Sequence, residues 1–176
     1  NWNFRYKLKK NLVLTGMMGS GKTSVGKSLS KKLNMEFGDT DSIIENKMSL
    51  SISDIFNSKG EEYFRKIEEA ESIKLVQKES FVVALGGGAF LNDAIRKEVK
   101  KNCISVWLEV NIDELFRRTK NSRKRPLLNN INNTKDLKKF YEKRKKVYAL
   151  SDYKINCDNK TEDAIIDEII GIYENS

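Results

Sequence analysis

The chain has 176 residues, 39% of them hydrophobic, so it is long and apolar enough to bury a core and should not be disordered. It contains no histidine, which excludes histidine as a catalytic base or metal ligand, and no apolar run approaches the length of a membrane span. The formal net charge of +8 suits small anions or nucleic acid and does not decide between them. We expect a cytoplasmic protein with no membrane partner, in which Cys103 and Cys157 are small core residues.

The first motif follows a short apolar run. Residues 16–23 read Gly-Met-Met-Gly-Ser-Gly-Lys-Thr, a P-loop between a predicted strand, 11–15, and a predicted amphipathic helix, 22–33. Its glycines allow successive N–H groups to surround a phosphate, and the helix N-terminus adds positive potential. Lys22 can reach the β- and γ-phosphates, and the Thr23 hydroxyl can ligate Mg²⁺. A chance glycine-rich turn is the alternative; the strand–loop–helix context favours a nucleoside triphosphate site.

Alternating patterns continue along the chain. Further strands are predicted at 35–38, 81–85, 103–108 and 153–157, and further helices at 42–47, 51–58, 60–77, 92–101, 112–120, 134–148 and from Thr161 onward. Five strands separated by helices predict a mainly parallel sheet with helices on both faces, an α/β/α architecture in a single domain. Ligands of such sheets bind at the carboxyl ends of the strands, so the loops there should carry the chemistry.

The loop after the second predicted strand contains two carboxylates, Asp39 and Asp41. One can hold the hydration shell of Mg²⁺ while the other orients or deprotonates an acceptor hydroxyl. The alternative is a structural turn in which Asp41 or Ser42 caps the next helix. The residues of this loop alone do not separate the two interpretations.

Three consecutive glycines, 86–88, follow the third predicted strand. Because such a run costs backbone entropy, we expect it to serve a close approach of backbone to a ligand, although a tight turn is the alternative. Arg65 has Glu68 three residues later, where the carboxylate can orient the guanidinium for bidentate capture of a substrate carboxylate. Alone, Arg65 would more often be a surface ion pair.

The polar stretch 117–128 contains four of the chain's arginines and its only proline. This composition is typical of a lid whose arginines close on phosphates, or of a solvated basic loop. Arg144, in the helix that follows, is a further candidate cation.

Together these residues resemble the shikimate kinase family. The resemblance runs nearly the whole chain and includes the P-loop, Asp39-Thr40-Asp41, Asp54-Ile-Phe, Gly60-Glu61, Phe64-Arg65 with Glu68, Gly86–Gly88, Arg125-Pro-Leu-Leu and Arg144-x-x-x-Tyr148. It implies a P-loop kinase fold over 1–176, with a substrate-binding region at about 39–68 together with 86–88, and a mobile lid at about 119–133. It also implies Mg²⁺-dependent transfer of phosphate from ATP to the 3-hydroxyl of shikimate.

The resemblance implies a role for each matching residue. The catalytic residues are Lys22, Asp41 and Arg125. The ATP site comprises Gly19, Ser20, Gly21, Lys22, Thr23, Ser24, Arg118, stacked on adenine, and Arg125 of the lid. The shikimate site comprises Asp41, Arg65, Gly86, Gly87, Gly88 and Arg144, with the arginines on the carboxylate. Mg²⁺ is held by Thr23 and, through water, by Asp39. The adenine loop of the family often contains a proline that 157–161 lacks, so the adenine contacts there stay open.

Three other functions compete with this one. Another small-molecule P-loop kinase, such as a gluconate kinase, is the main alternative, against which the triple glycine with Arg65 and Arg144 argues. A catalytically silent ATP-binding module is disfavoured by intact Lys22, Asp41 and Arg125. A nucleic-acid binder would explain the charge, but the chain has no recognisable nucleic-acid motif. We expect a monomer that binds shikimate and no nucleic acid.

Overall fold

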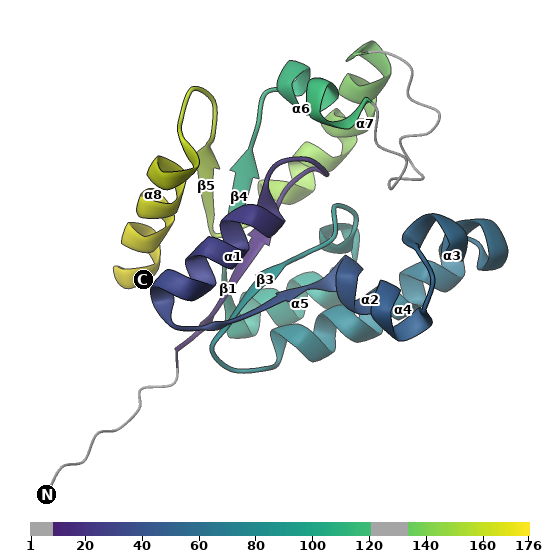
Figure 1. The fold of residues 1–176 in the computed structure, drawn as a ribbon, viewed down its shortest axis with the longest axis horizontal. Helices are drawn as coiled ribbons and strands as arrows, with labels where there is room; N and C mark the ends of the chain where they lie inside the picture. The colour runs from purple at the N-terminus through teal and green to yellow at the C-terminus, as the bar shows by residue number, and fades with distance from the viewer. Residues whose placement is uncertain (1–8, 121–133) are drawn as a thin grey trace, which may run out of the picture.

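A computed structural model describes residues 9–120 and 134–176. Its five-stranded sheet has the order β2-β3-β1-β4-β5, and every pair is parallel (Figure 1). The strands are β1 (Asn11–Thr15), β2 (Glu36–Asp39), β3 (Phe81–Ala84), β4 (Cys103–Glu109) and β5 (Tyr153–Asn156). The predicted parallel α/β fold is confirmed.

The helices lie close to the predicted ranges. They are α1 (Lys22–Leu33), α2 (Thr40–Met48), α3 (Ile52–Lys59), α4 (Glu61–Val76), the 3₁₀ turn η1 (Ala89–Leu91), α5 (Asp93–Asn102), α6 (Ile112–Thr119), α7 (Thr134–Tyr148) and α8 (Glu162–Glu174). The hydroxyl of Thr161 accepts a hydrogen bond from the Ala164 N–H, which confirms the predicted cap of the last helix. The turn η1 has no counterpart in the sequence prediction because three residues are too few to show a helical period.

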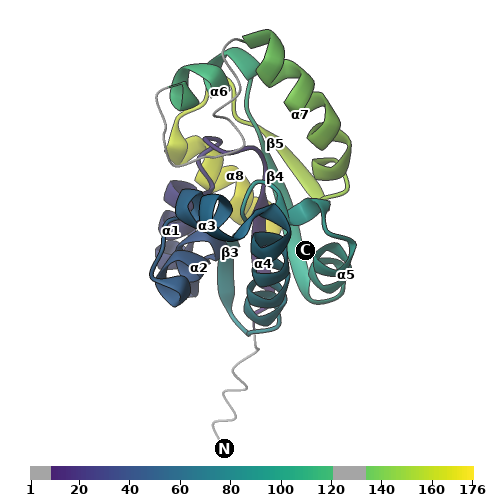
Figure 2. The same cartoon turned by 90° about the vertical axis from the view of Figure 1, so that its right-hand side faces the viewer.

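Alternation along the central strand separates two cores. Leu12 and Leu14 of β1 belong to a cluster with α1 and α8, whereas Val13 belongs to a cluster with α4, α5 and α7. Successive side chains of a strand point to opposite faces, so this alternation gives the sheet one helical layer on each side. The two layers flank the sheet in Figures 1 and 2. Cys103 is a core residue, as expected, whereas Cys157 is only half-buried, and both thiols are free.

A third, smaller apolar cluster lies beyond the edge of the sheet. Ile44 of α2, Ile55 of α3 and Phe64 of α4 form its buried centre. It packs α2 and α3 against the first turns of α4, at the right of Figure 1. These three helices carry the side chains that enter the site from the β2 side.

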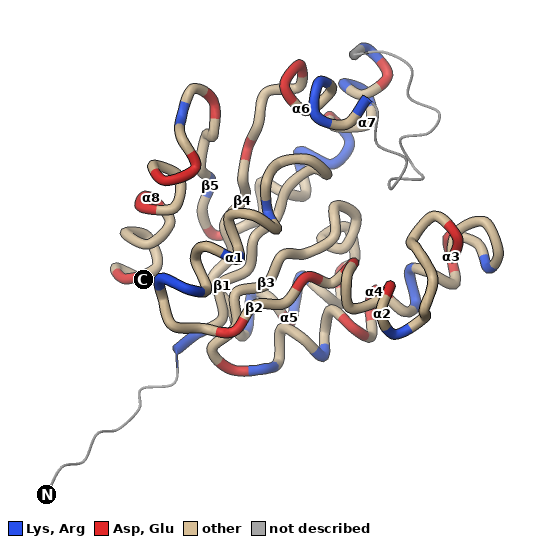
Figure 3. Tube along the Cα trace, in the orientation of Figure 1, with Lys and Arg blue, Asp and Glu red and all other residues tan. Residues whose placement is uncertain are grey.

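Charge is distributed over the whole described surface. Both signs of charge occur along the chain, but α1 carries only basic residues and α8 only acidic ones (Figure 3). Within the described ranges, no helix has both the length and the apolar character needed to cross a bilayer.

Candidate active site

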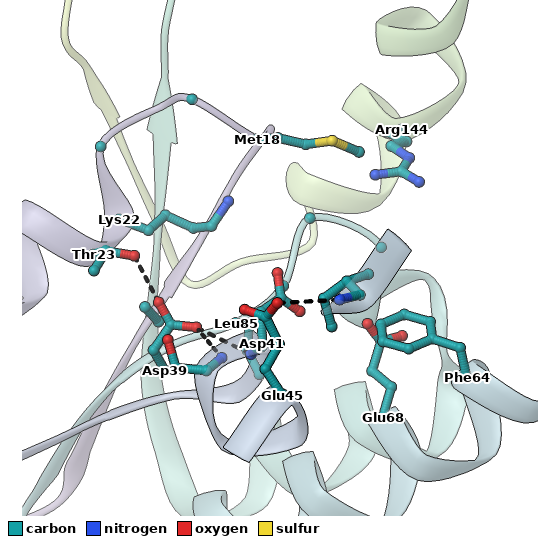
Figure 4. A pocket seen from close by; sticks show the side chains of 18 of the residues that line it. Met18, Lys22, Thr23, Asp39, Asp41, Glu45, Phe64, Glu68, Leu85 and Arg144 are labelled. Atoms are coloured by element: carbon teal, nitrogen blue, oxygen red, sulfur yellow. Dashed lines mark hydrogen bonds between the residues drawn. The ribbon is translucent and has the colours of Figure 1, made fainter. Parts of the chain in front are cut away.

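A pocket of about 660 Å³ lies at the carboxyl ends of β1, β2 and β3. Its walls come from the P-loop, the start of α2, the glycine run after β3, and arginines of α4, α6 and α7. Lys22 from α1 and Arg144 from α7 enter from different sides, with Asp41 below them (Figure 4). The loops after β1, β2 and β3 therefore line the pocket as predicted, whereas β4 contributes through Arg118 of the following helix.

The P-loop is shaped for an anion. Gly16 and Gly21 have φ values of 140° and 101°, a region that disfavours side chains, so glycine is required there. Gly21 is the N-cap of α1 and supplies no side-chain hydrogen bond, and the first turn of α1 contains no acidic residue. No side chain therefore caps the N–H groups at this helix end, and phosphate oxygens are suitable acceptors for them. The Lys22 ammonium donates to the carbonyls of Gly16 at 2.6 Å and Met17 at 3.0 Å, which holds it at the loop.

Asp39 has a structural and a site role at once. Its Oδ1 accepts hydrogen bonds from the N–H groups of Asp41 at 3.0 Å and Ser42 at 3.2 Å, so it caps α2. Its Oδ2 accepts from the Thr23 hydroxyl at 2.6 Å. The interpretation in which Asp41 or Ser42 caps the helix is wrong: the cap lies two residues earlier, and Asp41 is left to face the pocket. Paired hydroxyl and carboxylate oxygens beside a phosphate site fit Mg²⁺, a hard cation that prefers oxygen ligands.

Asp41 is a partly buried carboxyl group among other acids. Burial, with the negative charges of Asp39 and Glu68, raises the pKa of Asp41 to about 6, against the opposing effect of Lys22. Its proton affinity is therefore close to the range in which a general base operates. The carboxyl lies directly against Gly86, where an added Cβ would be 2.6 Å from Asp41 Oδ1.

Each glycine of the run 86–88 makes room for a different polar side chain. An added Cβ on Gly87 would be 3.3 Å from Arg144 Nη1, and one on Gly88 would be 2.5 Å from Arg65 Nη1. None of the three has a positive φ, so their backbone conformation does not itself require glycine. The Gly86 N–H donates to the Thr40 hydroxyl at 2.8 Å and is therefore already used within the protein.

Two arginines line the end of the pocket farthest from α1. Arg65 donates to Glu68 at 2.8 Å, as predicted, and Glu68 is only 2% exposed. Burial raises the pKa of Glu68, and the Arg65 charge opposes this. Arg144 is 4% exposed, and its Nη1 is buried without a hydrogen-bond partner in the described part of the chain. A buried guanidinium nitrogen left unpaired indicates an anionic ligand.

Arg118 spans from α6 to the P-loop. It donates to the Gly19 carbonyl at 2.9 Å and to Glu114 at 2.8 Å. Hydrogen bonds from Arg117 and Arg118 lower the pKa of Glu114 to about 2, so this carboxylate is charged near neutral pH. The Ser24 hydroxyl, at the other side of the P-loop, donates to Glu162 at 2.9 Å. Arg125 and most of the predicted lid, 119–133, lie outside the described residues.

Comparison with known proteins decides the family. The chain matches the shikimate kinase family model over residues 18–174. It is 44% identical to the shikimate kinase of Sulfurihydrogenibium sp. (strain YO3AOP1), over 92% of this chain and 96% of that protein, and 39% identical to that of Persephonella marina, over 92% and 98%. The chain belongs to the shikimate kinase family.

Solved structures agree with this assignment. Shikimate kinase from Acinetobacter baumannii, in complex with shikimate, has a TM-score of 0.90 and 31% identity, over 95% of this chain and 94% of that one. A gluconokinase from Sinorhizobium meliloti has a TM-score of 0.51 at 14% identity and shows a shared fold alone. The main alternative from the sequence, a gluconate kinase, is therefore only a distant neighbour.

Sequence reasoning missed part of this shikimate kinase pocket. Met18, Phe56 and Phe64 line it, although the helical spacing of Phe64 indicates only a core position. Burial of Arg144 was also missed, because the neighbouring lysines of α7 make it look like one more surface cation. The available signal was helical spacing: Arg144 lies on the same face of α7 as the buried Leu137, Tyr141 and Tyr148.

Proposed function

We propose that this chain transfers the γ-phosphoryl group of ATP to the 3-hydroxyl of shikimate, forming shikimate 3-phosphate and ADP. One observation carries the proposal beyond family membership. A single pocket joins a P-loop to a buried Arg144 nitrogen that has no hydrogen-bond partner among the described residues, with the carboxyl of Asp41 between them (Figure 4). A triphosphate at one end and a carboxylated alcohol at the other would fill this pattern of charge.

The arginines bind the acceptor in this proposal. Arg144 and Arg65 take the shikimate carboxylate, because guanidinium groups pair with carboxylates through two parallel hydrogen bonds. Glu68 orients the Arg65 guanidinium by accepting its hydrogen bond. Gly86, Gly87 and Gly88 complete the acceptor site by admitting the side chains that surround it.

Asp41 orients the 3-hydroxyl and takes its proton. The Asp41 carboxylate lies near enough to Lys22 for the lysine charge to lower the pKa of Asp41. A 3-hydroxyl bound at Asp41 would therefore lie close to the phosphate-binding residues. Phosphoryl transfer depends chiefly on positioning and charge neutralisation, which these side chains supply. The proton leaves the hydroxyl as the new P–O bond forms and the bond to ADP breaks.

The phosphates are bound by Lys22 and the P-loop residues Gly19, Ser20 and Gly21, and Ser24 and Arg118 extend the ATP site. Thr23 and, through water, Asp39 would hold Mg²⁺, which when bound neutralises the charge of the phosphate oxygens. Arg125 of the lid is proposed to contact the transferred group. A monomeric, cytoplasmic enzyme that binds no nucleic acid stays a prediction.

A coupled ADP-release assay tests the function. With ATP and Mg²⁺ present, shikimate should stimulate ADP release, whereas gluconate and nucleoside monophosphates should not. Absence of a shikimate-dependent signal, or a larger signal with another acceptor, would refute the proposal. The variant Lys22→Met is the matched negative control, since it removes the ammonium and keeps a flexible chain of similar length.

A further inference from the structure

The last residue of α7, Tyr148, is fully buried beneath the pocket and has no role in the mechanism above. Its exposed fraction is 0%, and its ring packs against Trp107 with the centroids 6.0 Å apart. The hydroxyl donates to the Gly87 carbonyl at 2.6 Å and lies 3.7 Å from the Met17 sulfur. One phenol therefore contacts the glycine run and the P-loop from α7.

The neighbours of this hydroxyl belong to the acceptor end of the pocket. Arg144 lies one helical turn before Tyr148, close enough for its charge and hydrogen bonding to lower the pKa of Tyr148, against the larger, raising effect of burial. Gly87 packs on the other side of Arg144, with 3.3 Å from an added Cβ to Nη1. Arg144, Tyr148 and Gly87 thus form a closed group in which each borders the other two.

The contact also reaches the nucleotide side. An added Cβ on Gly87 would lie 3.2 Å from Met18 Cγ, so Gly87 packs against the P-loop. The same residue accepts the hydrogen bond from the Tyr148 hydroxyl. A partly buried hydrogen bond at this place fixes the spacing between two loops that bind different substrates. Its loss would leave the Gly87 carbonyl without that donor at a site only partly open to water, which is costly.

We propose that Tyr148 is a positioning residue, whose hydroxyl holds Gly87 against Arg144 and so keeps the acceptor-binding arginine aligned with the P-loop. This role rests on the proposed function, in which Arg144 binds the carboxylate of shikimate. Tyr148 itself touches neither substrate. Its effect should therefore appear in acceptor binding more than in nucleotide binding.

The variant Tyr148→Phe, which removes only the hydroxyl, tests the role. The Michaelis constant for shikimate should rise about tenfold, while that for ATP stays within about twofold. Tyr141→Phe is the matched control: Tyr141 lies two turns earlier on the same helix and is 6% exposed, and its hydroxyl makes no hydrogen bond with the described residues. Its kinetics should equal those of the wild type.

Two further measurements separate positioning from a general loss of stability. Combined with Arg144→Lys, Tyr148→Phe should raise the Michaelis constant for shikimate by less than the product of the two single effects, because the hydroxyl acts through Arg144. Shikimate should also raise the melting temperature of Tyr148→Phe less than that of the wild type, with equal shifts from ATP.

The outcomes distinguish the two proposals. Wild-type turnover without shikimate dependence would refute the proposed function. If the wild type turns over normally, two results would refute the positioning role alone. One is an equal change of both Michaelis constants in Tyr148→Phe, and the other is a multiplicative effect in the double variant. A lower melting temperature with unchanged Michaelis constants would also refute it, since the hydroxyl would then only stabilise the fold.

Discussion

The glycines after β3 act by leaving space. Their φ values are open to any residue, yet a side chain at each would meet Asp41, Arg144 or Arg65. The structure shows close approach of these glycines to the protein's own charged side chains. The predicted close approach of their backbone to a ligand stays a prediction. A single missing methyl group at each position thus determines where a charged group of the pocket can lie.

Replacement of Gly88 tests this directly. In Gly88→Ala the new methyl would lie 2.5 Å from Arg65 Nη1, and the guanidinium, as the flexible end of a side chain, should move away. The protein should fold, and the Michaelis constant for shikimate should rise about tenfold or more in steady-state assays, because a charged hydrogen bond is lost. The control is Gly171→Ala in α8, where no atom lies within 4 Å of the added Cβ. Unchanged shikimate kinetics in Gly88→Ala would contradict the steric account.

Asp41 combines activity with a cost to stability. Its pKa is raised from 3.8 to about 6 on folding, so the folded protein binds the proton more tightly than the unfolded chain, and stability falls as pH rises between these values. The ionised form needed above pH 6 is the form that the folded protein holds less favourably. This is the usual consequence of placing a base in a partly dry site.

The variant Asp41→Asn should therefore lose turnover and gain stability. We expect kcat to fall about 100-fold or more, with ATP binding retained, and the free energy of unfolding at pH 7.5 to rise. In the wild type, kcat should decrease as pH falls through about 6, the pKa of Asp41. Rate–pH profiles and urea unfolding at two pH values measure both effects. Unchanged turnover in the variant would remove Asp41 from the mechanism.

At the scale of elements, helix ends position most of the site. Asp39 ends β2, caps α2 and bonds Thr23, so one carboxylate joins three elements. The sequence pattern predicted α2 from residue 42, whereas the helix begins at Thr40. The predicted range was short because several adjacent polar residues could each cap a helix, and local propensity does not rank them. Tertiary contact with the P-loop selects Asp39.

The α6 ion pairs allow a test of nucleotide positioning. Glu114 bonds both Arg117 and Arg118, but only Arg118 continues to the Gly19 carbonyl. In Glu114→Gln the Michaelis constant for ATP should rise a few-fold and that for shikimate should not change. The effect should shrink at high salt, because the pair is solvent-exposed. Arg117→Gln is the control, since Arg117 has no described contact with the P-loop. Equal effects of both variants would show that the charge of α6, rather than Arg118, matters.

At the scale of the whole molecule, the strand order creates the pocket. The chain passes from β1 to β2, returns to β3 beside β1, and then crosses to β4 on the other side of β1. This change of direction opens a crevice at the carboxyl ends of β1 and β3, where the P-loop and the glycine run meet. Helix and strand periodicity predicted the layers, but not which strands are neighbours.

Removal of Mg²⁺ should affect turnover and not the stability of the fold. The described residues contain no cluster of three or more Asp, Glu, His or Cys that could hold a metal, so Mg²⁺ is expected to bind with the nucleotide rather than to support the fold. Chelation by EDTA should abolish turnover and leave the melting temperature of the nucleotide-free protein unchanged. Calorimetry and ADP release, before and after Mg²⁺ is restored, measure this. A lower melting temperature with EDTA would indicate a structural metal.

The sequence by itself determined the P-loop, the alternation of strands and helices, and the pairing of Arg65 with Glu68. These features depend on residues close together in the chain, where spacing and backbone chemistry decide the outcome. Only the tertiary structure decided that Asp39 caps α2, that Arg144 is buried with its Nη1 unpaired among the described residues, and that the Tyr148 hydroxyl donates to Gly87. Each of these features depends on segments that are far apart in the chain and that the sheet topology brings together. Local sequence patterns do not determine such long-range contacts.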